Sequence, residues 1–263
     1  MRRIAFFITT IFMCSVSFAQ TETLNWYIDG NVYTTTQCES GNDILLPTTP
    51  TKRGYTFKGW ARYVPIEYLE STGTQYIDTG TTVSTDYTFV IKMAWTRIEE
   101  VTTFFGSKEN QIWTNGRYLG VTYYSNNKTF YSRARTETAF GVEPTLFSPI
   151  VNIVNNILFK PSSCKFAFNN VEYVCGGISQ TADVFTTANN LYIFATNQAG
   201  TAAQFDYVRL YNFRIYNSSN ILVRDFIPVL DGNGTPCMYD KVERKFYYNA
   251  GTGQFIAGPV IGE

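Results

Sequence analysis

The sequence contains no histidine among its 263 residues. Ser-His-Asp and Cys-His arrangements both need an imidazole as general base, so neither form of nucleophilic catalysis is available. Imidazole metal ligands are excluded for the same reason. Chemistry based on carboxylates or on a Ser-Lys pair stays open, so the absence removes most hydrolase designs but not all of them.

The N-terminal 19 residues read as a signal peptide. Arg2 and Arg3 provide a positive start, Ile4 to Met13 is mostly apolar, and Ser17-Phe18-Ala19 has the small-x-small pattern of a cleavage site. The apolar stretch is much shorter than the ~20 residues that a membrane span needs. We therefore expect cleavage before Gln20 and a secreted or cell-envelope protein, extracellular or periplasmic.

Clusters of positive charge are also missing. Loss of Arg2 and Arg3 leaves 19 of the 21 basic residues against 21 acidic ones, a net charge of −2. Nucleic-acid binding depends on clustered Lys and Arg, so a nucleic-acid partner is not expected. No long apolar run follows residue 20, so we also expect no membrane span after cleavage.

Aromatic residues are abundant instead, with 21 Phe and 19 Tyr, and this composition favours β-structure. Strand-like runs recur at short intervals with turn residues between them, which predicts an all-β, two-sheet antiparallel sandwich or jelly roll. In the clearest run, alternation places Val208, Leu210, Asn212, Arg214 and Tyr216 on one face. The other face would then carry Tyr207, Arg209, Tyr211, Phe213 and Ile215. The strand-like runs are 87–94, 102–106, 117–124, 128–134, 151–159, 164–175, 190–195, 205–216, 221–229 and 245–248.

One hairpin can be read in detail. Asn169-Asn170 suits a two-residue turn, because Asn tolerates positive φ, and the turn aligns Cys164 with Cys175. An exported protein meets an oxidising compartment, so a Cys164–Cys175 disulfide is predicted, with two reduced, packed thiols as the alternative. Pairing of Cys38 with Cys237 would have to cross two modules and is not favoured. The same turn would pair Phe168 with Val171 and Phe166 with Tyr173, with Lys165 and Glu172 on the outer face.

Residues 20–63 form the first expected module. A strand pattern at 23–29, a turn at Asp29-Gly30-Asn31 and a return at 32–36 precede Pro50-Thr51-Lys52-Arg53-Gly54-Tyr55-Thr56-Phe57-Lys58-Gly59-Trp60. This motif resembles the internalin B-repeat family, β-grasp-like modules of bacterial surface proteins. The resemblance implies spacing or adhesion rather than catalysis. Tyr55, Phe57 and Trp60 are expected to form the core of this small module, with a sugar-stacking platform as the alternative.

Residues 64–263 form the second expected module. Its opening segment 67–80 (EYLESTGTQYIDTG), the strand 208–216 (VRLYNFRIY) and the segment 222–229 (LVRDFIPV) resemble laminin-G-like, concanavalin-type jelly-roll domains of bacterial secreted proteins. The resemblance implies the fold. Function is left open, because this fold carries lectins, adhesion domains and some glycosidases.

Two kinds of site suggested by this resemblance find little support in the sequence. A retaining glycosidase of this type needs Glu-x-Asp-x-x-Glu on one strand; no such run occurs, and Glu67 and Glu70 are wrongly spaced. Calcium needs clustered oxygen ligands, whereas Asp78, Asp225 and Asp231 lie apart and suit turns better. No cofactor is expected, and calcium stays possible without support.

The sequence thus predicts a non-catalytic binding or adhesion protein whose jelly roll recognises an extracellular glycan or surface protein. A secreted glycosidase on the same scaffold and a structural envelope component are the alternatives. Aromatic rings beside Asn and Arg suit sugar hydroxyls or a protein epitope. The ligand-binding candidates on this reasoning are Trp113, Arg117, Tyr118, Tyr123 and Tyr124, with core packing as the alternative for each of them.

Overall fold

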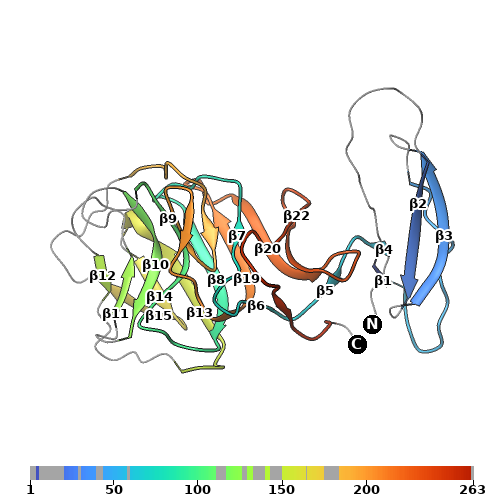
Figure 1. Ribbon diagram of the computed structural model, residues 1–263, viewed down its shortest axis with the longest axis horizontal. Coiled ribbons are helices and arrows are strands. Elements are labelled where there is room, and N and C mark those ends of the chain that lie inside the picture. Colours follow the sequence, from blue (N-terminus) through green and yellow to red (C-terminus); the bar gives the residue numbers. More distant parts are fainter. Residues whose placement is uncertain are drawn as a thin grey trace.

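The computed structural model describes residues 4–5, 21–28, 31–39, 44–57, 60–110, 117–125, 129–132, 140–142, 150–163, 165–174 and 184–261. These residues form strands and loops, with one 3-10 turn, η1 (Pro161–Ser163), and no α-helix. Within them, no helix is long and apolar enough to cross a membrane. Figure 1 shows a sandwich of strands with a separate hairpin at one end of the molecule.

The hairpin consists of β2 (Thr21–Ile28) and β3 (Asn31–Glu39), paired antiparallel along their length. It confirms the two strands expected in this module. Beside it, β1 (Ile4–Ala5) runs parallel to β4 (Trp60–Ala61), so part of the expected signal peptide pairs with the end of the repeat motif. Cleavage before Gln20 would remove β1.

Aromatic packing holds this small unit together. Trp26 is 1% exposed, and its ring centroid lies 4.8 Å from that of Trp60, which in turn contacts Phe57 at 5.2 Å. Two of the three predicted core aromatics are therefore in place. Tyr55 is not: its side chain is 45% exposed and lies under the Lys52 ammonium, because the turn opened by Gly54 (φ +82°) directs it to solvent.

The first sheet of the sandwich, the β9 sheet, runs in the order β12-β11-β10-β9-β16-β7, with β17 and β18 attached beside β9. Its pairings are antiparallel except for β17 with β9. The strands are β7 (Ile77–Asp78), β9 (Val101–Lys108), β10 (Tyr118–Tyr124), β11 (Thr129–Ser132), β12 (Phe140–Val142), β16 (Tyr192–Ile193), β17 (Thr196–Gln198) and β18 (Thr201–Ala203).

The second sheet, the β8 sheet, runs β15-β14-β13-β8-β19-β20-β21-β22. Strand β5 joins it at β20, β6 joins it at β19, and β23 pairs with β6. Its pairings are all antiparallel. The strands are β5 (Val64–Pro65), β6 (Leu69–Glu70), β8 (Thr88–Trp95), β13 (Asn155–Lys160), β14 (Lys165–Phe168), β15 (Val171–Val174), β19 (Val208–Tyr216), β20 (Leu222–Leu230), β21 (Pro236–Asp240), β22 (Lys245–Tyr247) and β23 (Ile256–Ala257).

The core lies between these two sheets. Phe89 of β8 and Phe105 of β9 stack with centroids 5.1 Å apart, and Phe213 of β19 meets Phe105 edge-on at 5.2 Å. All three side chains are at most 1% exposed. Burying a Phe side chain contributes ~1.5–3 kcal/mol, so this aromatic layer is a main source of stability. The predicted all-β sandwich is confirmed.

Strand β19 departs from simple alternation. Leu210 pairs with Met93 and Asn212 with Lys92, so Tyr211 is an extra residue in a β-bulge. The bulge shifts the pattern by one residue, and Val208, Leu210, Phe213 and Ile215 all enter the core. The prediction that Phe213 and Ile215 share a face with Tyr211 was wrong. It assumed an unbroken period of two.

The β14–β15 hairpin has the predicted register. Phe168 pairs with Val171 and Phe166 with Tyr173, while Asn169 and Asn170 adopt φ of 48° and 66°. Lys165 and Glu172 form an exposed ion pair at 2.6 Å on the outer face. Val171 is 55% exposed, so the apolar face is open at the turn.

Cys164 and Cys175, the partners of the expected disulfide, lie outside the described residues. The disulfide stays a prediction. Cys237 is a free, fully buried thiol whose pKa is raised by burial. The Cys38 thiol donates a hydrogen bond to the Glu39 carbonyl at 3.5 Å.

Candidate recognition surface

The predicted ligand-binding residues do not gather at one exposed place. Tyr118 and Tyr123 are each 2% exposed; Tyr123 joins the core between the sheets. Arg117 is exposed, and its guanidinium lies 5.3 Å from the centroid of the Phe185 ring. Trp113 lies outside the described residues. Tyr124 ends β10, and its side chain is likewise not described. Their binding roles stay predictions.

Tyr118 instead belongs to a buried polar chain on the face of the β9 sheet away from the core. Its hydroxyl lies 2.8 Å from Thr122 Oγ1, which is 2.9 Å from Thr103 Oγ1. Thr103 also donates to the Gln204 amide oxygen at 3.4 Å. Such a satisfied network costs little to bury and fixes side-chain positions. Its described members favour a structural role.

The Asp residues considered for calcium are engaged elsewhere. Asp231 Oδ1 accepts hydrogen bonds from the backbone N–H groups of Asn233 and Thr235, both at 2.8 Å, as the turn interpretation predicts. Asp78 accepts the Gly80 N–H at 2.8 Å in the same manner. Asp225 forms ion pairs with Arg214 and Lys241.

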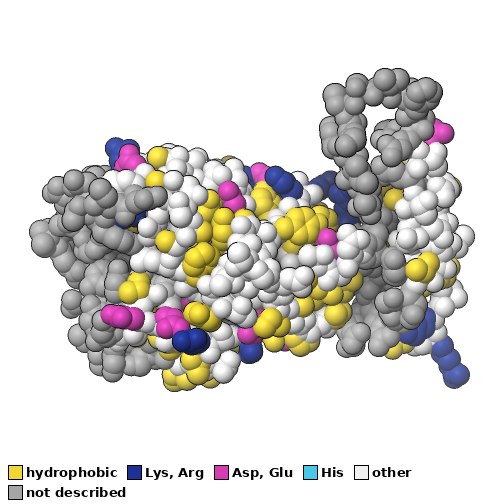
Figure 2. Space-filling model, in the orientation of Figure 1, with side chains coloured by type: hydrophobic (Ala, Val, Ile, Leu, Met, Phe, Trp, Pro, Cys, Tyr) yellow, Lys and Arg dark blue, Asp and Glu magenta, His cyan; other side chains and the backbone are white. Residues whose placement is uncertain are grey.

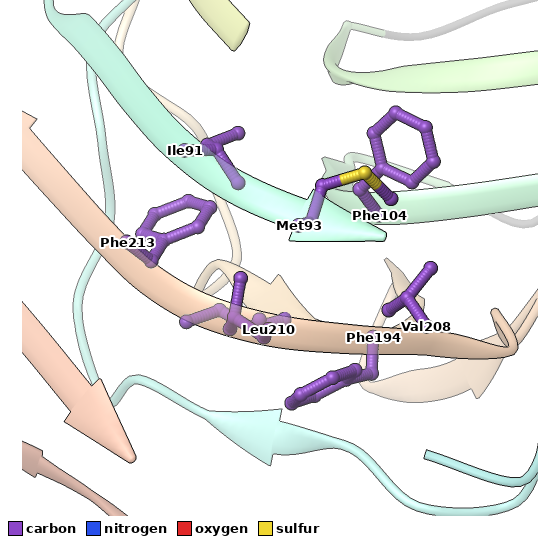
Figure 3. Close-up of a pocket in the computed structure, with 8 residues that line it drawn as sticks. Ile91, Met93, Phe104, Phe194, Val208, Leu210 and Phe213 are labelled. Carbon is purple, nitrogen blue, oxygen red and sulfur yellow. The ribbon is translucent and has the colours of Figure 1, made fainter. Parts of the chain in front are cut away.

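A pocket between the sheets is an internal cavity. Only about 10 Å³ of it is open to the centre of a water-sized sphere. Figure 3 shows apolar side chains of β8, β9 and β19, such as Met93, Phe104 and Leu210, pointing into it. It has room for about one water molecule and no polar side chain to hold one.

An exposed group of aromatic and cationic side chains lies on the solvent face of the β8 sheet. We call it the tyrosine–cation surface: Tyr68, Lys92, Tyr207, Arg209 and Tyr211. The β19 bulge keeps Tyr211 outside the core, and its ring meets that of Tyr68 edge-on with centroids 5.6 Å apart. Lys92 is exposed, whereas the other four are partly exposed.

A lysine or arginine side chain lies over the ring of each tyrosine of this surface. The Arg209 guanidinium lies 4.8 Å from the Tyr68 centroid, and the Lys92 ammonium lies 5.4 Å from the Tyr211 centroid. The Arg97 guanidinium lies 5.0 Å from the centroid of Tyr207. Contacts of this kind contribute about 0.5–1 kcal/mol at exposed sites and restrict the cation. The surface therefore presents cations in fixed places.

Backbone and electrostatics hold these groups further. Gly73 has φ +93°, and a Cβ there would lie 2.3 Å from the Tyr207 ring, so only glycine lets the ring approach. Arg209 Nε donates to Glu70 at 2.6 Å, which raises the pKa of the guanidinium. Burial, with the nearby Glu67 carboxylate, raises the pKa of Tyr211.

Sequence reasoning missed this surface. Tyr207, Arg209 and Tyr211 alternate with core residues, and that signal was available. The contribution of Tyr68 and Lys92 depends on strand pairing across long sequence separations, which one sequence does not reveal. Figure 2 shows acidic and basic side chains dispersed over the coloured part of the face in view, rather than gathered into one large patch.

Comparison with known proteins gives one family match. Residues 23–92, about a quarter of the chain, match the family described as the Listeria-Bacteroides repeat domain. The match continues past residue 63 into β8. This β-rich repeat is found in extracellular bacterial proteins, and the match supports a bacterial surface protein. No curated protein sequence matches the chain.

Solved structures give distant likenesses. A proposed carbohydrate-binding protein from Bacteroides ovatus is 11% identical, with 94% of this chain and 71% of that chain covered and a TM-score of 0.49. The NanB sialidase from Streptococcus pneumoniae is also 11% identical, with 74% and 39% covered and a TM-score of 0.40. At this degree of likeness, neither name bears on the ligand or activity of this chain.

Proposed function

We propose that this protein is exported and binds an extracellular glycan through its sandwich, without catalysing a reaction. An internalin B-repeat-like unit at residues 20–63 serves as a spacer, and a laminin-G-like sandwich at residues 64–263 carries the recognition surface. The observation that carries this proposal is the tyrosine–cation surface. Amphipathic rings and oriented cations together provide apolar contact and hydrogen-bond donors for sugar hydroxyls.

The alternative partner for an adhesion domain is a surface protein. Protein interfaces concentrate their binding energy in large side chains that fill pockets on the partner. The tyrosines of this surface are held against their own sheet, where Tyr68 and Tyr207 pack on backbone at Gly258 and Gly73. This arrangement favours a ligand with many small polar groups, and thus a glycan.

Binding is tested on a glycan array with the purified protein and the Tyr211→Ala variant. We expect glycan binding by the protein and a loss of at least about tenfold in the variant, as for a central aromatic contact. Tyr55→Ala is the matched control, since Tyr55 is an exposed tyrosine under a lysine in the repeat unit. Equal binding by all three proteins would remove the surface from the proposal.

Catalysis and export need separate measurements. Any bound glycan is incubated with the protein and assayed for new reducing ends. Release that a single Asp or Glu substitution abolishes would replace the binding function by a glycosidase. N-terminal sequencing of the exported protein is expected to start at Gln20, and a product that starts at Met1 would contradict the signal peptide.

A further inference from the structure

The solvent face of the β8 sheet has more cations than carboxylates at its centre. We call Lys92, Arg209, Arg214 and Lys241 the cationic strip. Arg209 is paired one-to-one with Glu70, whereas Arg214 and Lys241 share Asp225, each at 3.0 Å. Lys92 makes no ion pair with any described residue. The Glu67 carboxylate also lies near Tyr211, so four cations face three carboxylates and one positive charge is not balanced.

Strand pairing makes the strip continuous. Lys92 of β8 lies opposite Asn212 of β19, Arg214 follows on the same face of β19, and Asp225 lies opposite Arg214 on β20. The Lys241 N–H bonds to the Asp225 carbonyl, which places Lys241 beside the same carboxylate. Cations thus follow one another across neighbouring strands, from β8 to the turn that follows β21.

This local excess opposes the charge of the whole protein. The chain after Gln20 has a net charge of −2 on the expected cleavage, so general charge does not account for a positive strip. A positive strip on a protein of low net charge attracts anions to that place. Arg and Lys held over tyrosine rings are also oriented in advance for carboxylate or sulfate oxygens.

The position of the strip limits the shape of the ligand. Strand β8 is paired on both sides, by β13 and β19, and β19 is flanked by β8 and by β6 or β20. The backbone groups of these strands are used within the sheet, so a peptide cannot add a strand here. A polymer that carries repeated negative charges can lie across the strands and contact several cations.

We infer that the strip and the adjoining tyrosines bind an anionic polysaccharide, with carboxylate or sulfate groups. This inference rests on the proposed glycan-binding function and names its ligand class. Lys92 and the free terminal nitrogens of Arg209 hold one anionic group beside the Tyr211 ring. Arg214 and Lys241 hold a second group further along the strip.

The test measures binding of the full purified protein to four polymers: polygalacturonate, dextran sulfate, neutral dextran and polyglutamate. Each is assayed at about 0.01 M and about 0.15 M salt, between which the screening length falls from ~30 Å to ~8 Å. We expect polygalacturonate, dextran sulfate or both to bind, more weakly at the higher salt, and neutral dextran not to bind. Polygalacturonate and dextran sulfate distinguish carboxylate from sulfate as the recognised group.

Lys92→Glu is the decisive variant. It is expected to weaken binding of the anionic polysaccharide about five- to tenfold, since it reverses an exposed charge next to the ligand. Lys52→Glu is the matched control, because Lys52 also lies over a tyrosine, at 4.6 Å, but in the repeat unit. It should bind within about twofold of the unchanged protein. Circular dichroism confirms that both variants are folded.

The outcomes separate this inference from the proposed function. Salt-insensitive binding of neutral dextran would overturn the anionic class and keep glycan binding. Binding of polyglutamate alone would assign the strip to an acidic peptide and overturn both. Equal losses in Lys92→Glu and Lys52→Glu would remove the strip as the site. Binding of none of the four polymers would also overturn the inference, and an empty glycan array would then overturn the proposed function too.

Discussion

Asp206 is an unusual residue for its environment. Its side chain is fully buried, Oδ1 accepts the Tyr207 N–H at 2.8 Å, and Oδ2 has no hydrogen-bond partner. Burial raises the pKa of this carboxyl to about 8. The cost of burying a charge is avoided only while the group is protonated. Asp206 should therefore make stability depend on pH.

The direction of this pH dependence follows from the pKa of the Asp206 carboxyl in the unfolded and in the folded protein. The carboxyl has a pKa near 4 when unfolded and about 8 when folded. Its contribution to the free energy of unfolding is complete below about pH 4 and is lost as pH rises to about 8. Asp206→Asn keeps the acceptor for Tyr207 and carries no charge. Urea unfolding should show the variant more stable at pH 8, by at most about 5 kcal/mol.

At pH 5 the two proteins should differ much less, and the variant is expected to be equal or slightly less stable, because its amide N–H groups are buried without acceptors. Parallel pH profiles for the two proteins would show that Asp206 is not the titrating group.

At the scale of elements, the β14–β15 turn depends on two residues with positive φ. Asn170→Ala keeps the strands but removes the side-chain amide that lets asparagine tolerate the left-handed region, at φ 66°. We expect a loss of about 1–2 kcal/mol in the free energy of unfolding, measured with urea. Asn156→Ala is the control, an exposed asparagine on β13. Its effect should stay within ~0.5 kcal/mol, and an equal loss would contradict the turn argument.

This hairpin shows what the sequence could predict. Turn residues and alternation over ten residues determine its register, because the pairing of β14 with β15 is local. The β19 bulge depends on pairing with β8, more than a hundred residues away, and alternation alone assigned Phe213 and Ile215 to the wrong face. The tyrosine–cation surface was missed for the same reason. Its residues come from β8, from β19 with the residue before it, and from the residue that precedes β6, which are distant in the sequence.

The predicted Cys164–Cys175 disulfide belongs to the same element. The ladder pairs Lys165 with Val174. The prediction is that the register continues by one residue and sets the two cysteines opposite each other. Opposed residues in such a ladder lie near the Cα spacing that a disulfide needs. Peptide mapping under non-reducing conditions should recover a linked peptide, and free thiols at both positions would exclude it.

For the whole molecule, the connection between the hairpin unit and the sandwich is an aromatic contact. Tyr63 packs against Val229, Cys237 and Tyr239 on the β8 sheet, and the rings of Tyr63 and Tyr239 lie 4.5 Å apart. Immediately after it, β5 pairs with β20. A unit of about forty residues buries little surface and is marginal alone. Tyr63 therefore fixes the chain where the small unit meets a stable neighbour.

Tyr63→Ala tests this role. Removing the ring takes away a partly buried contact worth about 1–2 kcal/mol but leaves the core between the sheets unchanged. We expect faster limited proteolysis between residues 57 and 63, mapped by mass spectrometry, while the sandwich stays resistant. Tyr55→Ala removes an exposed ring in the same unit and should leave cleavage unchanged. Unaltered cleavage in Tyr63→Ala would mean that β5 pairing alone secures the junction. General unfolding of the sandwich would instead place Tyr63 within its main core.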